Sequence, residues 1–426
     1  MNHISSPYGR LSFMVATCLA ALVTLNSYGA LLDASQEVVT YPPLGLQSGS
    51  QNVKTNLAGF YDFSDRNGDS TAVAVTPAGL DMTNRNLTTT TVASKDISLK
   101  LNGGNLMAST GSIKTGPANN AAGNVYIYNV GSIAMGDGYI YTRSYGAGHV
   151  YVGQNGVAGP RAGSIQVNGI VAFYAYAGGN VTVYGSSDVL IKNASGVATD
   201  IVTSGTSNGR VLIQHDGTFL VQDVLATCNY YNTRADLFFD GDVLQNGASG
   251  TFTARLLDTH DVIPTWGAYT TDPGNITVSN YTSVSIGSLD THEYSGGHNA
   301  GSVKVGGIAG DIKITGMINL DATNGPSQEG SLTLTAGGNI QVTTLNMDLV
   351  GTVTLTAGQE AYISVLTNFN KASPATSGLL AGNSGSIYYS PANNPDLVAG
   401  GVNGVYALAQ GTLKPKWPTG TMVLVR

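Results

Sequence analysis

Short segments in which apolar and polar residues alternate recur along most of the sequence. The clearest of them begin with a glycine and read GSVKV from Gly301, GDIKI from Gly310, GSLTL from Gly330 and GNIQV from Gly338. This alternation places apolar side chains on one face of a short strand and polar side chains on the other, and glycine permits the bend between strands. Because the paired segments recur after 29 residues (330 − 301 = 29), the pattern predicts the stacked coils of a β-solenoid.

Segments of this kind extend over residues 96–390, where no stretch has the periodicity of a helix. We therefore expect an all-β fold, a right-handed parallel β-helix, because parallel crossovers twist to the right. Residues 31–95 and 391–426 lack regular repeats and are expected to form N- and C-terminal capping segments that cover the open strand edges. An irregular excursion is expected at about 228–273, where charged and aromatic residues are denser.

The composition narrows the range of partners. Charged residues make up 11% of the 426-residue chain, against a usual share of about 25%, and the formal net charge is −7. No basic patch of the kind that nucleic acid requires is expected. Because uncharged polar residues and 22 tyrosines must supply much of the surface, it suits contact with polysaccharide, a cell surface or further copies of the chain.

The first 30 residues have the pattern of a secretory signal peptide. Arg10 precedes an apolar run from Leu11 to Leu25, and small residues follow up to Ala30. The run is shorter than a transmembrane helix requires. We therefore expect residues 1–30 to be removed, the mature chain to have no transmembrane segment, and the protein to be secreted to the extracellular space or the cell surface.

One repeated motif brings metal-binding residue types together. Asp258-Thr259-His260 recurs as Asp290-Thr291-His292, at an offset close to one coil (290 − 258 = 32). In stacked coils, equivalent residues would lie one strand spacing apart, about 4.8 Å. Carboxylates and imidazoles brought together in this way can bind a divalent metal. The alternative is a repeated turn in which Asp and Thr bond the backbone.

A second candidate metal site lies in the N-terminal segment. Asp65, Asn67 and Asp69 present oxygen atoms at alternate positions, as a loop that wraps Ca²⁺ does. The twelfth position of such a loop needs a bidentate carboxylate and is occupied by Thr76. The alternative is a turn rich in Asx residues. No cofactor is expected beyond Ca²⁺ or another divalent metal.

Aromatic residues form the candidate binding surface, which consists of Tyr126, Tyr128, Tyr139, Tyr141 and Trp266. Aromatic side chains that face outward on successive coils can stack on sugar rings or on another subunit, whereas inward-facing ones fill the core. The alternation around Tyr126 and Tyr128 does not decide between the two faces.

An acidic cluster raises the possibility of an enzyme. Asp236, Asp240 and Asp242, with Arg234 and Arg255 nearby, have the residue types of a polysaccharide-cleaving site, where paired carboxylates act as acid and base. Solvated acids in turns are the alternative. The chain has no phosphate loop or CxxC motif. We therefore assign no catalytic residue and favour a function without catalysis.

The Gly-[Asn/Ser/Asp]-[Val/Ile]-x-[Val/Ile/Leu] units over about 96–390 resemble those of bacterial secreted β-solenoids, such as filamentous haemagglutinin-like adhesins and autotransporter passengers. The resemblance implies a secreted structural or adhesive protein that self-assembles into fibres or a surface layer. Two alternatives stay open. One is a polysaccharide lyase or glycosidase with its site in 228–300, and the other is a metal-stabilised, carbohydrate-binding solenoid.

Overall fold

The structure is a computed structural model, and the residues that it describes fall into short, closely spaced ranges. These are 54–55, 60–62, 79–81, 86–88, 97–100, 103–116, 122–142, 146–153, 161–174, 177–205, 209–227, 235–242, 247–260, 272–293, 300–320, 330–347, 351–374, 378–381 and 385–417. Within these ranges the regular elements are strands, apart from the short helix α2 (Pro395–Val398).

One side of the molecule is an 11-stranded sheet, which we call the first row. Every neighbouring pair in it is parallel. Its strands are β5 (Ile97–Lys100), β8 (Val125–Tyr128), β11 (Val150–Val152), β16 (Val181–Tyr184), β19 (Val211–Gln214), β22 (Leu237–Asp240), β24 (Ile276–Ser279), β26 (Val303–Ile308), β28 (Leu332–Ala336), β30 (Val353–Ala357) and β32 (Leu379–Ala381).

The other two sides of each coil begin as separate rows of short parallel strands. The second row contains β3 (Gly79–Asp81), β6 (Asn105–Met107), β9 (Ile133–Ala134), β12 (Ile165–Val167), β17 (Val189–Ile191) and β20 (Phe219–Leu220). The third row contains β2 (Phe60–Asp62), β4 (Asn86–Thr88), β7 (Ile113–Lys114), β10 (Ile140–Tyr141), β13 (Ile170–Val171), β18 (Ile201–Val202) and β21 (Asp223–Leu225).

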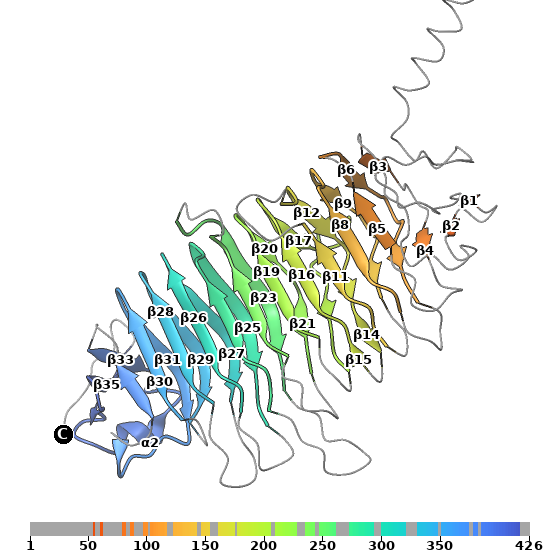
Figure 1. The fold of residues 1–426 in the computed structure, drawn as a ribbon. Helices are drawn as coiled ribbons and strands as arrows, with labels where there is room; N and C mark the ends of the chain where they lie inside the picture. Colours follow the sequence, from red (N-terminus) through yellow and green to blue (C-terminus); the bar gives the residue numbers. More distant parts are fainter. Residues whose placement is uncertain are drawn as a thin grey trace, which may run out of the picture.

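The second and third rows merge at β23 (Thr251–Asp258), which pairs with β20 through its first half and with β21 through its second. The later strands of the merged rows are β25 (Ser283–Asp290), β27 (Ile312–Asn319), β29 (Ile340–Asn346), β31 (Ala361–Thr367), β33 (Ser386–Tyr389) and β35 (Thr412–Pro415). Figure 1 shows the coils stacked side by side in the order of the sequence. The prediction of an all-β parallel solenoid is confirmed.

Among the described residues, three pairs of short strands are antiparallel. They join β1 (Lys54–Thr55) to β2, β14 (Phe173–Tyr174) to β15 (Ala177–Gly178), and β34 (Tyr406–Ala407) to β35. Near the C-terminus, Asn394 fixes α2 to the last long coil, because its Nδ2 donates to the carbonyl of Ser364 at 2.8 Å and its Oδ1 accepts from the backbone N–H of Leu366. The capping function of the terminal segments stays a prediction.

Two regular strands lie within the interval expected to be irregular, 228–273. They are β22 and β23, and side chains that are buried alternate with side chains that are not along β22 and along the first half of β23. The segment that forms β22 begins with Ala235 where most coils have glycine, so its repeat is harder to recognise in the sequence.

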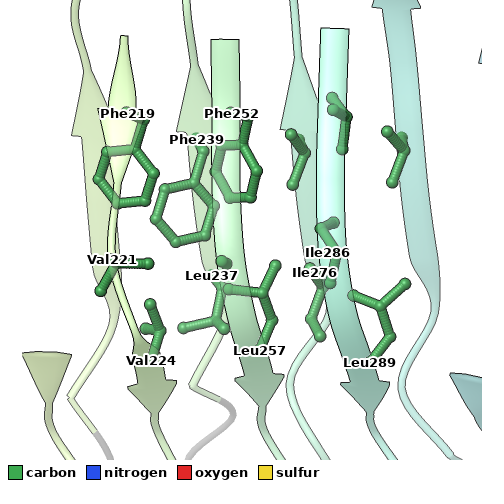
Figure 2. Close-up of a cluster of buried hydrophobic side chains, with 14 of the residues drawn as sticks. Phe219, Val221, Val224, Leu237, Phe239, Phe252, Leu257, Ile276, Ile286 and Leu289 are labelled. Atoms are coloured by element: carbon green, nitrogen blue, oxygen red, sulfur yellow. The ribbon is translucent and has the colours of Figure 1, made fainter. Parts of the chain in front are cut away.

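The core runs along the inside of the stack, between the rows. Val125, Val150 and Val181 are in register on successive coils and are fully buried. Halfway along, the core changes from aliphatic to aromatic. There the ring centroid of Phe219 lies 5.1 Å from that of Phe239 and 5.0 Å from that of Phe252, and Figure 2 shows the three rings together above Leu237 and Leu257.

In several coils, the polar residue that precedes a first-row strand links one coil to the next. The Oδ1 atom of Asn124 accepts a hydrogen bond from the backbone N–H of His149 at 2.8 Å, and Asn180 Oδ1 accepts from the N–H of Arg210 at 2.8 Å. His149 belongs to the same column, since its Nδ1 accepts from the N–H of Asn180. The Gly-Asn/Ser/Asp motif thus satisfies a backbone donor where a strand begins.

Candidate functional site

A column of buried threonines shapes the corner between the third and first rows, and the Asp-Thr-His motifs lie at this corner. Thr259 Oγ1 donates to the carbonyl of Gly274 at 2.7 Å, and Thr291 Oγ1 donates to that of Gly301 at 2.8 Å. The same bond is made in earlier coils by Thr115, Thr142 and Thr203. The threonine therefore serves the corner itself, and its position sets the direction of the residues on either side.

The two motifs stack in the predicted register. Asp258 pairs with Asp290 across β23 and β25, and the rings of His260 and His292 are parallel within 8°, with centroids 4.8 Å apart. In each motif, the Asp Oδ1 accepts from the backbone N–H of its histidine and also lies 2.5 Å from the Nδ1 atom of that ring. The turn hydrogen bonds of the alternative interpretation are thus present, and they orient both imidazoles.

The cluster has the composition of a metal site. His260, Asp290 and His292 each offer one ligand atom, and these three atoms lie within 4.8 Å of one another. Asp258 is 6% exposed and supports His260 from behind. The side chains of His260 and His292 are 25% and 15% exposed, so an ion from solution can reach them.

The other predicted metal residues, Asp65, Asn67 and Asp69, lie outside the described residues, as does Trp266. The calcium loop and the function of that tryptophan therefore stay predictions.

Tyr126 and Tyr128 face outward, which the sequence alone left open. On β8, Val125 and Ile127 are buried while both tyrosines are partly exposed. Val130 breaks the alternation because Asn129 has a left-handed backbone with φ of 47°. The ring of Tyr126 stacks on that of Tyr151 in the next coil, with centroids 5.2 Å apart and an angle of 4° between the planes.

Tyr139 and Tyr141 do not join that stack. Tyr141 is the last residue of β10 in the third row, and Tyr139 directly precedes that strand. In contrast, β8 and β11 belong to the first row. Tyr139 is 38% exposed and Tyr141 is half-buried. The four tyrosines predicted to form a binding surface therefore lie on two different sides of the solenoid.

Sequence reasoning missed a hollow of about 370 Å³ on the outer face of the first row. Phe238, Thr277 and Lys304 stack in register on β22, β24 and β26 along one side of it. Gly306 and Gly307 also line it, at the point where a register shift interrupts the pairing of β26 with β28. The only signal in the sequence was the equivalent position of the three side chains within their strands.

The acidic residues considered for catalysis bind the backbone or nearby amides. Asp236 Oδ1 accepts from the N–H of Asn275 at 2.8 Å, and Asp240 Oδ1 accepts from Asn280 Nδ2 at 2.9 Å. Asp242 accepts from the N–H of Gly247 at 3.2 Å. The first two contacts link adjacent coils and the third stabilises a local turn.

The arginine of that cluster has a different partner. Arg255 forms an ion pair with Asp223, which is 5% exposed and lies on β21. The pKa of nearby Asp200 is raised. Burial is the larger cause, and the charge of Asp223 raises it further. Arg234 lies outside the described residues. In the described part of the chain, Arg255 thus compensates two acids of the third row.

The fold and its repeated corners define the class of the protein, which is a parallel β-solenoid. No family model, no curated protein and no solved structure matches the chain. Among the residues that the structure describes, no helix is long and apolar enough to cross a membrane.

Proposed function

We propose that the protein is a secreted, extracellular β-solenoid with a structural or adhesive function, which associates with copies of itself or with surface polysaccharide. The observation that carries the proposal is the continuous parallel stack from β5 to β33, which forms a long scaffold with weakly charged faces. Secretion is supported by the signal-peptide pattern of residues 1–30.

The first row offers the most suitable contact surface. Tyr126, Tyr151, Leu212 and Phe238 occupy one outward column, in register and partly exposed. Aromatic and aliphatic side chains in such a column favour contact with a second flat, weakly charged surface, because burial removes apolar area from water. We therefore place the adhesive or self-associating face here.

Electron microscopy and light scattering of the mature protein over a range of concentrations test this assignment. We expect fibres, sheets or larger species for the wild type, and weaker association for a Tyr126→Thr, Tyr151→Thr double variant. Threonine occupies the same column at Thr182, so the variant should keep its fold. A wild type that stays monomeric at the highest concentration would contradict self-association.

The hollow beside Phe238 favours a second candidate function, carbohydrate binding. Its volume of about 370 Å³ lies within the range of small-molecule sites, roughly 300–1,000 Å³. The ring of Phe238 offers an apolar face, Thr277 and Asn280 offer hydrogen-bonding groups, and Lys304 offers a positive charge. A sugar unit with a carboxylate would match this combination.

Binding to a panel of neutral and acidic oligosaccharides tests the second function. Phe238→Ala should abolish binding, and Gly306→Ala should weaken it by narrowing the hollow. If both variants bound the oligosaccharide as strongly as the wild type does, the hollow would be excluded as the binding site. Cleavage of any polysaccharide by the wild type, lost in Asp240→Asn, would instead favour the enzyme alternative.

A further inference from the structure

We propose that His260, His292 and Asp290 bind a divalent transition-metal ion of the zinc type, which links two successive coils. This inference does not depend on the proposed function, since a metal link at this corner would serve a structural, adhesive or catalytic solenoid equally.

The corner itself does not need the aspartate or the histidine. At Thr115, Thr142 and Thr203 the same buried threonine makes the same bond to a carbonyl, and the preceding residues are Lys114, Tyr141 and Val202. The Asp-His pair is therefore an addition to a turn that forms without it. Among the described corners it is present on two adjacent coils, β23 and β25, where the copies can act on one ion.

The hydrogen bonds prepare both imidazoles as ligands. An ionised carboxylate only accepts hydrogen bonds, so the Nδ1 atom that lies 2.5 Å from Asp Oδ1 carries the proton in each neutral ring. In His260 the lone pair is then on Nε2, and Asp258, bound to the opposite nitrogen, fixes the ring. In the second motif Asp290 is itself a candidate ligand, so an ion bound by both Asp290 and His292 would take the place of the proton between Asp290 Oδ1 and His292 Nδ1. Asp258 thus positions His260 in the way that metal-binding histidines are usually supported.

The spacing is close to what one ion requires. Two bonds of about 2.1 Å from zinc to nitrogen, at a tetrahedral angle, place the two ligand atoms about 3.4 Å apart. The candidate ligand atoms lie within 4.8 Å of one another, so at this limit they would approach by about 1.4 Å through rotation of the side chains. A bound cation would also offset the repulsion between the carboxylates of Asp258 and Asp290, which lie in register on neighbouring strands.

The ligand types select the class of metal. Two imidazoles and one carboxylate suit Zn²⁺, Cu²⁺ or Ni²⁺, whereas Ca²⁺ takes six to eight oxygen ligands. Water would complete the coordination, since the cluster supplies three side chains and four-coordinate zinc needs one more ligand.

Calorimetric titration of the tag-free, chelator-treated protein with ZnCl₂ tests the proposal. We expect saturable binding of one ion by the wild type, a loss of at least about 100-fold in affinity for His292→Asn, and a 10- to 100-fold loss for Asp258→Asn. Ca²⁺ should not compete. The matched control is His149→Asn, which should bind Zn²⁺ as the wild type does, because asparagine occupies the same column at Asn124 and Asn180.

Each variant is checked by circular dichroism and by its melting temperature without metal. A second measurement does not depend on variants: the electron paramagnetic resonance spectrum of the wild type with one equivalent of Cu²⁺ should show coupling to imidazole nitrogen. No saturable Zn²⁺ binding by the wild type, unchanged binding in His292→Asn, or oxygen-only Cu²⁺ coordination would each overturn the proposal.

Discussion

At the scale of single residues, the glycine that precedes a first-row strand is required because the backbone of the coil before it lies very close. A Cβ atom on Gly209 would lie 1.9 Å from the carbonyl oxygen of Gly179. The glycine therefore permits close backbone approach, and the repeated motif reflects this contact. Gly306, in contrast, has no heavy atom nearer than Lys304 Cε at 4.0 Å from the same ideal position.

We expect Gly209→Ala to lower the free energy of unfolding by about 1–3 kcal/mol or more, because the methyl group displaces the neighbouring backbone. Gly306→Ala is the matched control and should change it by less than about 1 kcal/mol. Denaturation in urea, followed by circular dichroism, measures both. Equal effects of the two substitutions would contradict the close-approach argument.

His215 is a second residue whose environment decides its behaviour. It is fully buried, with Nε2 2.9 Å from the Tyr281 hydroxyl and Nδ1 3.1 Å from the carbonyls of Ser187 and Asp216. Because Nδ1 donates to a carbonyl, Nε2 accepts from the hydroxyl. Burial lowers the pKa of His215 below 6.5, although these carbonyls and the charges of Asp216 and Asp188 oppose the shift.

The unfolded chain therefore takes up a proton at His215 at a higher pH than the folded chain does. The full stability is present above about pH 6.5, and it is lost as the pH falls from there through the lowered pKa. We expect the melting temperature to fall between pH 7 and 5, with a smaller fall in His215→Gln. The same slope in both proteins would show that His215 does not contribute.

At the scale of one strand, alternation separates a core face from a surface face within β22. Phe239 is fully buried against Phe219 and Phe252, while its neighbour Phe238 faces outward beside Thr277. The two side chains are chemically identical, so their different environments isolate the effect of burial.

Phe239→Ala should destabilise the protein by about 3–5 kcal/mol, because it leaves a cavity in the aromatic part of the core. Phe238→Ala should cost less than about 1 kcal/mol, since water already reaches that ring. Thermal and urea unfolding of the pair provide the measurement. A larger loss for Phe238→Ala would mean that the faces of β22 are reversed.

At the scale of the whole molecule, each coil contacts chiefly the coil before it and the coil after it. The parallel pairings join strands that follow one another within a row, and Figure 1 shows the rows extending along the stack. Stability in such an array is approximately a sum of coil and interface terms, so a local defect should have local effects.

Hydrogen exchange of Phe239→Ala tests this locality. We expect faster amide exchange in β19, β22 and β24, and unchanged exchange in β8 and β31, because only the adjacent coils contact the cavity. Phe238→Ala serves as the control. A uniform increase along the chain would indicate that the solenoid unfolds as one cooperative unit.

Several features of the site were predictable because the repeat is regular. The offset of 32 residues placed Asp258 over Asp290, and the structure pairs them. The faces of Tyr126 and Tyr128 were not predictable, since Asn129 changes the alternation through its left-handed backbone. The hollow beside Phe238 was hidden for a related reason, because Ala235 replaces the glycine that marks most coils.

The sequence by itself determined the strands and their stacking, because alternation and glycine act over a few residues and recur at nearly every coil. Only the tertiary structure decided which outward side chains meet across coils, because the connections between coils differ in length and sequence distance does not give spatial order. His260 beside His292, and Phe238 in line with Lys304, depend on that register.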